Sequence, residues 1–246
     1  MKQINCEQGT NQWHEARRCM ITSTKLDSVM GTPWDRLMLA CELIAEEASE
    51  QTKAFKVTPE MERGTAEEVF SRKHFEKLTN KKVTQIGFCI SDEFPYLGVS
   101  GDGWIESNGK FTEAFETKSP DTKNAVFYKL EDLMSAEELG LGSYSESTKA
   151  NPTPVFKPSA KAPFLGLPSQ YQWQAVNYFL VNTDLQKLHF SIYDARFLDE
   201  KSRMHIVVVE RNHPLMQEAL SEARTELISF REFWMKCRTK IINDSF

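Results

Sequence analysis

The sequence contains no long apolar run. Its densest apolar stretch, Ile206 to Val209, is far too short to cross a membrane and suits a buried strand. The first residues, MKQINCEQGTNQW, also lack the apolar core that a secretory signal needs. We therefore expect an intracellular, cytoplasmic protein with no membrane partner.

Cysteine is sparse and follows no pattern. The five cysteines are odd in number and include no C-x-x-C pair, which argues against a disulfide framework, a zinc site and an iron–sulfur cluster. The five histidines are equally dispersed, and we expect them to be surface or packing residues. The sequence therefore predicts no metal site built from cysteine or histidine.

An excess of basic residues is also missing. Lys and Arg number 30 against 35 Asp and Glu, giving a net charge of −5, whereas nucleic-acid binders often carry a basic excess. This counts mildly against DNA binding, yet it does not exclude a nuclease whose basic residues line one channel while acidic residues hold metal. The 246 residues, 40 % apolar and 26 % charged, predict one soluble globular domain over residues 1–246.

The most informative segment present runs from Tyr96 to Pro120, YLGVSGDGWIESNGKFTEAFETKSP. It places Asp102 after an apolar run, and Glu116 and Lys118 in a second, alternating run. Alternation puts positions 116 and 118 on the same face of a strand. Two carboxylates and an ammonium at one sheet edge suit a hard divalent cation and the hydrolysis of a phosphodiester.

Magnesium is the cation that this donor set favours. It prefers oxygen ligands and keeps several waters, so Asp102, Glu116 and the backbone carbonyl of Thr117 are enough to hold it. Lys118 would orient or deprotonate the attacking water, or neutralise charge on the phosphate. The D…E-x-K pattern alone is weak, because a solvated hairpin with an ion pair produces it too. The glycines on both sides of Asp102 strengthen it, since backbone there turns sharply and a ligand can come close.

A helix predicted from Pro59 to Leu78 carries a carboxylate within its apolar stripe. Met61, Glu68 and Phe75 recur every seven residues and so share one face. Glu68 is therefore either paired or functional, whereas its neighbour Glu67 is expected to be a solvated charge.

The remaining patterns predict a mixed α/β fold, in which helices flank a central mixed β-sheet. Strands are expected at residues 83–90, 96–99, 103–106, 112–118, 188–193 and 205–210, and helices at 123–134 and 169–181. Residues 135–168 form a long connection rich in proline, glycine and serine.

Two further helices are predicted from caps and apolar spacing. One begins at Thr32-Pro33, with Trp34 expected in the core, although stacking on or wedging a DNA end is an alternative. Its expected buried face consists of Leu37, Cys41, Ile44 and Ala48. The last helix, from about Pro214, carries a stripe for core or subunit packing made by Met216, Leu220, Ala223, Leu227, Phe230 and Trp234.

Short motifs also recur in a fixed order over roughly residues 10 to 235. They are WHEAR (13–17), ITST (21–24), Arg63-Gly64 with Glu68, PYLG (95–98), SGDG (100–103), FETKSP (115–120), Tyr171 with Gln174, Tyr193-Asp194 and VVVER (207–211). In composition and order these blocks resemble the phage lambda exonuclease family, the YqaJ-type viral recombinases within the PD-(D/E)xK nucleases. The resemblance implies a restriction-endonuclease-like core.

The resemblance also implies a role for each residue of the catalytic centre. Asp102 and Glu116 would bind the catalytic Mg²⁺ ions, with Glu68 beside them, outside the direct ligands or bound through water. Two metals roughly 4 Å apart would stabilise the attacking and leaving oxygens, and Mn²⁺ would substitute. Lys118 and Gln174 would serve the attacking water.

A second group of residues is implied to hold the DNA end. Arg17, Thr24 and Ser100 match the positions that grip a 5′-terminal phosphate, and guanidinium and hydroxyl donors suit a phosphate dianion. Tyr171 would be a helper or packing partner of Gln174. The basic residues Lys25, Arg36, Lys53 and Lys56 are candidates for lining a duplex path, which the sequence does not distinguish from ordinary surface charge.

Four positions depart from the family pattern without removing a catalytic group. Gly101 stands where a proline usually precedes the aspartate, and Ser119 where a cysteine often follows the lysine. Thr24 stands where serine is common, and Val176 where a second glutamine is usual.

The family implies an Mg²⁺-dependent 5′→3′ exonuclease of phage or bacterial type. It would degrade one strand of linear double-stranded DNA to mononucleotides and leave 3′ single-stranded overhangs for single-strand-annealing recombination. A homotrimeric ring around DNA and a single-strand annealing protein are the implied partners, and a ring would reconcile the acidic charge with a DNA substrate. Two alternatives are a structure- or sequence-directed DNA endonuclease of the same superfamily and a catalytically inactive DNA-end-binding module.

Overall fold

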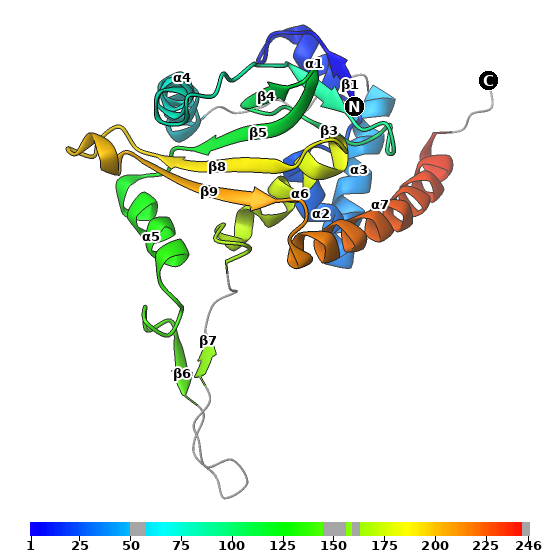
Figure 1. Cartoon of the computed structure of the whole chain (residues 1–246). Coiled ribbons are helices and arrows are strands. Elements are labelled where there is room, and N and C mark those ends of the chain that lie inside the picture. The colour runs from blue at the N-terminus through cyan, green and yellow to red at the C-terminus, as the bar shows by residue number, and fades with distance from the viewer. Residues whose placement is uncertain (50–57, 145–155, 159–162, 243–246) are drawn as a thin grey trace, which may run out of the picture.

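The structure, a computed structural model, describes residues 1–49, 58–144, 156–158 and 163–242. A four-stranded sheet lies at its centre, in the order β4 (Gly103–Ser107), β5 (Lys110–Lys118), β8 (Lys187–Tyr193) and β9 (Met204–Glu210) (Figure 1). The β5–β8 pair is parallel, and the two outer pairs are antiparallel. The mixed sheet predicted from the sequence is therefore confirmed.

A second, antiparallel sheet lies beside the first and is built from β1 (Lys2–Ile4), β2 (Phe88–Ile90) and β3 (Gly98–Val99). The single long strand predicted at 83–90 was wrong, because this run is divided between the two sheets. Thr84 forms one bridge with Trp104 of β4, whereas residues 88–90 pair with β1 and β3. The β1 strand was not predicted.

Helices cover both faces of the central sheet (Figure 1). On one face lies α4 (Pro59–Thr79), and on the other α6 (Gln172–Val181), which follows the 3₁₀ turn Ser169–Tyr171. Behind α6 pack α2 (Ser23–Val29), α3 (Pro33–Ser49) and α7 (Pro214–Ile241), while α1 (Asn11–Arg17) lies next to β1 and β2. A 3₁₀ turn, Glu200–Ser202, links β8 to β9.

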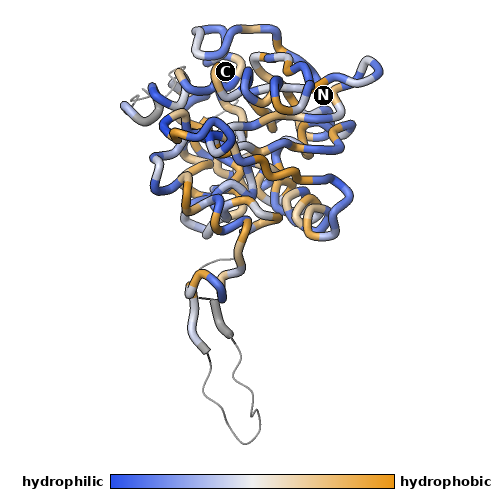
Figure 2. Tube along the Cα trace, turned by 60° about the vertical axis from the view of Figure 1, so that its left-hand side comes forward, coloured by the Kyte–Doolittle hydropathy of each residue, from blue (hydrophilic) through white to orange (hydrophobic). Residues whose placement is uncertain are grey.

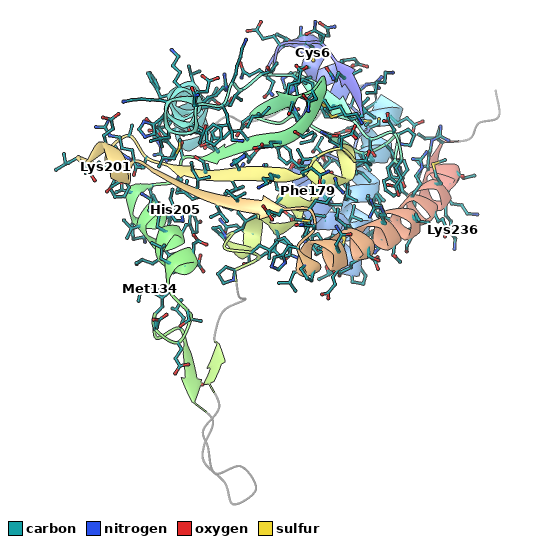
Figure 3. The ribbon with its side chains drawn as sticks, in the orientation of Figure 1. Cys6, Met134, Phe179, Lys201, His205 and Lys236 are labelled. Atoms are coloured by element: carbon teal, nitrogen blue, oxygen red, sulfur yellow. The ribbon has the colours of Figure 1, made fainter. Side chains whose placement is uncertain are left out.

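Alternation along β5 separates two packed layers. Phe115 faces α4, where its ring centroid lies 4.6 Å from that of Phe75. Glu116 faces the opposite way, toward α6, in the layer that also contains the buried Phe179 (Figure 3). Many of the hydrophilic segments lie in the outer loops of the molecule (Figure 2). The sheet thus delivers the E-x-K pair to the α6 side, as alternation predicts.

The start of α3 was predicted correctly, but its buried face was not. The Thr32 hydroxyl donates to Asp35 Oδ2 at 2.6 Å and fixes the first turn. Of the predicted row only Ile44 is buried, and Leu37, Cys41 and Ala48 are exposed. The other buried apolar residues of this helix, which packs against α2 and α7, are Leu39, Ala40 and Leu43. Apolar residues occupy two adjacent rows of this helix, so periodicity could not choose between them.

Trp34 was expected in the core, and this was wrong, since 67 % of it is exposed at the first turn of α3. The stripe on α7 is confirmed, because each of its six predicted apolar residues is buried. Within the described residues no helix is both long and apolar enough to span a lipid bilayer.

The segment between β5 and α6 begins with α5 (Thr122–Leu133) and includes a short antiparallel pair, β6 (Gly142–Tyr144) and β7 (Phe156–Pro158). Met134 marks the place where the chain leaves α5, and the β6–β7 pair projects away from the sheet (Figures 1 and 3). Part of the connection predicted at 135–168 lies outside the described residues.

Candidate active site

Asp102 lies in the link between β3 and β4, directly before the sheet begins. Its Oδ2 accepts a hydrogen bond from the backbone N–H of Thr117 at 2.8 Å. Because Gly103 is the pairing partner of Phe115, the strand register brings Asp102 beside the end of β5 that carries Glu116 and Lys118. The structure therefore joins the two carboxylates that the sequence separates.

Glu116 is the centre of the hydrogen-bond network. It is only 2 % exposed, and a buried carboxylate requires partners for its oxygens. Its Oε1 accepts from Lys118 Nζ at 2.6 Å and from the side-chain amide of Gln174. Its Oε2 accepts from the Tyr178 hydroxyl. The structure thus brings Lys118 from β5 and Gln174 from α6 together on one carboxylate.

The electrostatics of this cluster reflect crowded negative charge. Burial and, after it, the charges of Glu116 and Glu68 raise the pKa of Asp102 well above its usual value. Burial would lower the pKa of Lys118, but Glu116 and Asp102 outweigh that effect and raise it. The lysine is therefore a charged donor, suited to orienting a water or stabilising an oxyanion.

Glu68 reaches the same cluster from α4. Arg72 donates to its Oε1 at 2.6 Å and Gln85 at 3.3 Å. Burial raises the pKa of Glu68; the charge of Arg72 opposes this, and that of Glu116 adds to it. The carboxylate on the apolar stripe is thus both paired and close to the centre. Its neighbour Glu67 was expected to be a solvated charge, yet its Oε2 is buried without a partner among the described residues.

The donor set fits a hard divalent cation. Among the described residues no group of three or more His, Cys, Asp and Glu forms a ready metal cage. Asp102 and Glu116 nevertheless present carboxylate oxygens beside Thr117, and a cation that keeps most of its waters needs few protein ligands. The negative charge that raises the pKa values of Asp102 and Glu68 is what such a cation would neutralise.

A second polar site adjoins the first through the chain itself. Ser100 lies two residues before Asp102, and its hydroxyl accepts from Arg17 Nη1 at 2.7 Å and from Trp13 Nε1 at 2.9 Å. The guanidinium carbon of Arg17 lies 4.1 Å from the centre of the Trp13 ring. Stacking on the indole and bonding to Ser100 together fix the direction of the guanidinium.

Arg17 is a half-buried cation that makes no ion pair among the described residues. Burial lowers its pKa to about 10, so it remains charged at neutral pH. A charged guanidinium that is half-buried and has no carboxylate partner among the described residues is suited to binding an anionic ligand. Thr24, the third residue of the predicted phosphate site, is exposed on α2, and among the described residues it forms no hydrogen bond with Arg17 or Ser100.

The other predicted residues divide into those near the site and those away from it. Lys118 Nζ lies 5.5 Å from the centre of the Tyr171 ring, which also packs on Phe190, so Tyr171 borders the site. Lys25 pairs with glutamates of α3, and Arg36 pairs with one on α7, which makes both poor candidates for a duplex path. Lys53 and Lys56 lie outside the described residues.

Sequence reasoning missed two residues of these sites, Tyr178 and Trp13. Each lies four positions from a predicted residue on the same helix, Tyr178 from Gln174 and Trp13 from Arg17. Residues four apart share a helix face, so this spacing could have identified them.

Comparisons with protein families and with solved structures identify a viral recombinase domain and exonucleases, respectively, as similar to this chain. A sequence model of the YqaJ-like viral recombinase domain matches residues 12–186. The chain is similar to the solved structure of an alkaline exonuclease, LHK-Exo, from Laribacter hongkongensis, with 21 % identity and a TM-score of 0.65 over 94 % of this chain and 97 % of that one. The values are the same for LHK-Exo in complex with dAMP.

A phage related exonuclease from Haemophilus somnus 129PT is also similar, with 12 % identity and a TM-score of 0.60 over 91 % of this chain and 96 % of that one. No curated protein matches the chain. At these identities the structural likeness shows the fold alone, and that fold agrees with the mixed α/β class expected from the sequence.

Proposed function

Because this chain belongs to the YqaJ-like viral recombinase domain family, we propose that it is an Mg²⁺-dependent 5′→3′ exonuclease acting on linear double-stranded DNA. The observation that carries the proposal is the convergence of Lys118 and Gln174 on the buried carboxylate of Glu116, beside Asp102. In a site for hydrolysis, carboxylates hold metal while an ammonium and an amide position water. One or two Mg²⁺ ions would lower the pKa of the attacking water and stabilise charge on the phosphate.

The chain's own groups divide this work. Asp102, Glu116 and the backbone carbonyl of Thr117 would supply the ligand oxygens. Glu68 would lie outside the direct ligands or bind through a water. The Lys118 ammonium would donate to the water or to a phosphate oxygen, since its pKa is raised. Gln174 bonds to the same oxygen of Glu116 and would orient the attacking water from the α6 side.

The proposed polarity and product rest on the spacing of the two sites. Ser100 and Asp102 are two residues apart, so their Cα atoms are separated by at most about 7 Å. A 5′-terminal phosphate held by Arg17 and Ser100 would therefore place the next phosphodiester of the same strand near the carboxylates. That arrangement releases one nucleotide at a time from a 5′ end and leaves a 3′ single strand, the substrate of a single-strand annealing protein.

We further propose that the protein works as a homotrimeric ring around DNA. A ring retains DNA by topology, so a net charge of −5 is no obstacle. The exposed apolar residues Val126, Leu130 and Leu133 on α5 are candidates for a subunit contact. Size-exclusion chromatography with light scattering should give a mass near three times 28.3 kDa, and a mass of 28.3 kDa would exclude the ring.

One duplex offered in three forms tests the activity: linear with a 5′-phosphate, linear with a 5′-hydroxyl, and covalently closed circular. In Mg²⁺ we expect rapid loss of the phosphorylated linear form, slower loss of the hydroxyl form and an intact circle. Cutting of the circle would identify an endonuclease instead. Inertness toward all three forms, with retained binding of ends, would identify an inactive end-binding module.

A further inference from the structure

Tyr178 occupies a position between the two carboxylate residues. It is fully buried on α6, one turn after Gln174, with its ring centroid 5.6 Å from that of Trp104. Its hydroxyl donates to Glu116 Oε2 and accepts from the backbone N–H of Asp102 at 3.3 Å. A single hydroxyl therefore connects the side chain of one predicted metal ligand to the backbone of the other.

We propose that Tyr178 is a positioning residue that fixes Glu116 and Asp102 relative to each other for metal binding. The inference rests on the proposed function, because it assigns Tyr178 to the same metal site. The hydroxyl has one proton, which the hydrogen bond to Glu116 uses, and its lone pairs remain to accept from Asp102.

The donors around Glu116 indicate which oxygen is left for a metal. A carboxylate offers about four lone-pair sites, two on each oxygen. Lys118 and Gln174 both bond to Oε1, whereas Tyr178 is the partner of Oε2 among the described residues. The remaining lone pair therefore belongs to Oε2, the oxygen that Tyr178 holds. Partners that orient a ligand in this way commonly change metal affinity tenfold or more when removed.

Gly101 gives an independent reason to connect Tyr178 with the site. A Cβ at position 101 would lie 2.9 Å from Cε1 and 3.0 Å from the hydroxyl oxygen of Tyr178. These two distances are shorter than normal van der Waals contacts, so a side chain at position 101 would force the Tyr178 ring to shift. Gly101, directly before Asp102, thus leaves room for the tyrosine that bonds to both Asp102 and Glu116.

Metal binding in the absence of DNA tests the inference. We would measure Mn²⁺ affinity by titration calorimetry for the wild type, Tyr178→Phe and the control Tyr96→Phe. Tyr96 is half-buried, and its hydroxyl donates to the Leu227 carbonyl at 3.4 Å. We expect Tyr178→Phe to weaken Mn²⁺ binding about tenfold or more and to lower kcat without changing KM for linear duplex, while Tyr96→Phe matches the wild type.

A merely structural tyrosine would give a different result. Tyr178→Phe would then lower the midpoint of metal-free thermal unfolding, yet bind Mn²⁺ with wild-type affinity, and the inference would be overturned. Should Tyr178→Phe not fold, Gly101→Ala carries the test, because its Cβ displaces the tyrosine ring. Weaker Mn²⁺ binding by Gly101→Ala supports the inference, and wild-type affinity overturns it. Absence of Mn²⁺ binding by the wild type would instead refute the proposed function, and the inference with it.

Discussion

Arg17 and Ser100 are 83 positions apart in the sequence, yet Nη1 of the arginine donates to the serine hydroxyl at 2.7 Å. The bond joins the end of α1 to the link that leads into Asp102. A cation that pairs with no carboxylate among the described residues is thereby held next to the proposed metal site. On this pairing rests the proposal that Arg17 and Ser100 bind a phosphorylated 5′ end.

Replacing Arg17 should remove the preference for a 5′-phosphate. A hydrogen bond to a charged group contributes about 1.5–3 kcal/mol, so Arg17→Ala should lower the rate on 5′-phosphorylated duplex roughly 10- to 100-fold. The rate on 5′-hydroxyl duplex should change little, and the ratio of the two rates should approach one. Arg18→Ala is the matched control, because Arg18 is the next residue and pairs with Glu15 at 2.9 Å. An unchanged ratio in Arg17→Ala would remove this residue from end recognition.

Lys118 should be needed for the chemical step and not for metal binding. Lys118→Gln keeps a hydrogen-bond donor but removes the charge, and loss of a group that serves the attacking water costs typically 10²- to 10⁴-fold in kcat. Mn²⁺ affinity should be retained or increased, since the positive charge of the ammonium on Glu116 Oε1 repels a cation bound nearby. Lys110→Gln, at the exposed start of the same strand, should leave both quantities unchanged. If Lys118→Gln loses Mn²⁺ binding as well, the lysine has a structural role at the site.

Asp102→Asn should have opposite effects on stability and on activity. Without metal, removing a buried charge that lies near Glu116 and Glu68 should raise the unfolding midpoint by roughly 2–4 °C, the shift that about 1 kcal/mol produces in a chain of this size. With Mg²⁺ the wild type should gain stability by ligand linkage, whereas the variant should gain much less. Differential scanning calorimetry with and without EDTA measures both effects. Equal gains in Mg²⁺ would show that Asp102 is not a ligand.

The sequence predicted the elements of the site well because local rules control them. Alternation along β5 placed Glu116 and Lys118 on one face, and the seven-residue spacing on α4 identified Glu68 as an exception in an apolar stripe. Glycines on both sides of Asp102 marked the turn. Each of these patterns depends on residues that are close in the chain, so the predicted local structure did not depend on tertiary packing.

The predictions were wrong or incomplete where tertiary packing, and not the local sequence, determines the structure. Residues 83–90 favour a strand throughout, but only the neighbouring strands decide that this run divides between two sheets. Trp34 lies on a helix with more than one apolar row, and its exposure depends on which row meets α2 and α7. Tyr178 was overlooked because its role depends on two partners, Glu116 and Asp102, that are distant in sequence.

A buried histidine should make the fold sensitive to mild acid. His189 on β8 is hydrogen-bonded to Glu113 of β5, which Lys81 also contacts at 2.8 Å. Burial lowers the pKa of His189 below its usual 6.5, although Glu113 acts to raise it. At pH values between 6.5 and the lowered pKa of folded His189, the unfolded chain binds more protons than the folded chain. The free energy of unfolding therefore falls as the pH decreases through this range. Hydrogen bonds from Lys81 and His189 outweigh burial and lower the pKa of Glu113, whose contribution to stability is therefore lost only below about pH 4.5.

Two variants separate the effect of His189 from general acid sensitivity. His189→Gln keeps a donor for Glu113 but does not titrate, so its unfolding midpoint should fall less than that of the wild type between pH 7.5 and 5.5. Glu113→Gln removes the charge that supports protonation of His189 and leaves Lys81 nearby, so its midpoint should fall more steeply. Each unit of pKa displacement corresponds to about 1.4 kcal/mol, a difference that thermal scans at several pH values detect readily. Parallel curves for the three proteins would mean that His189 does not control the response to acid.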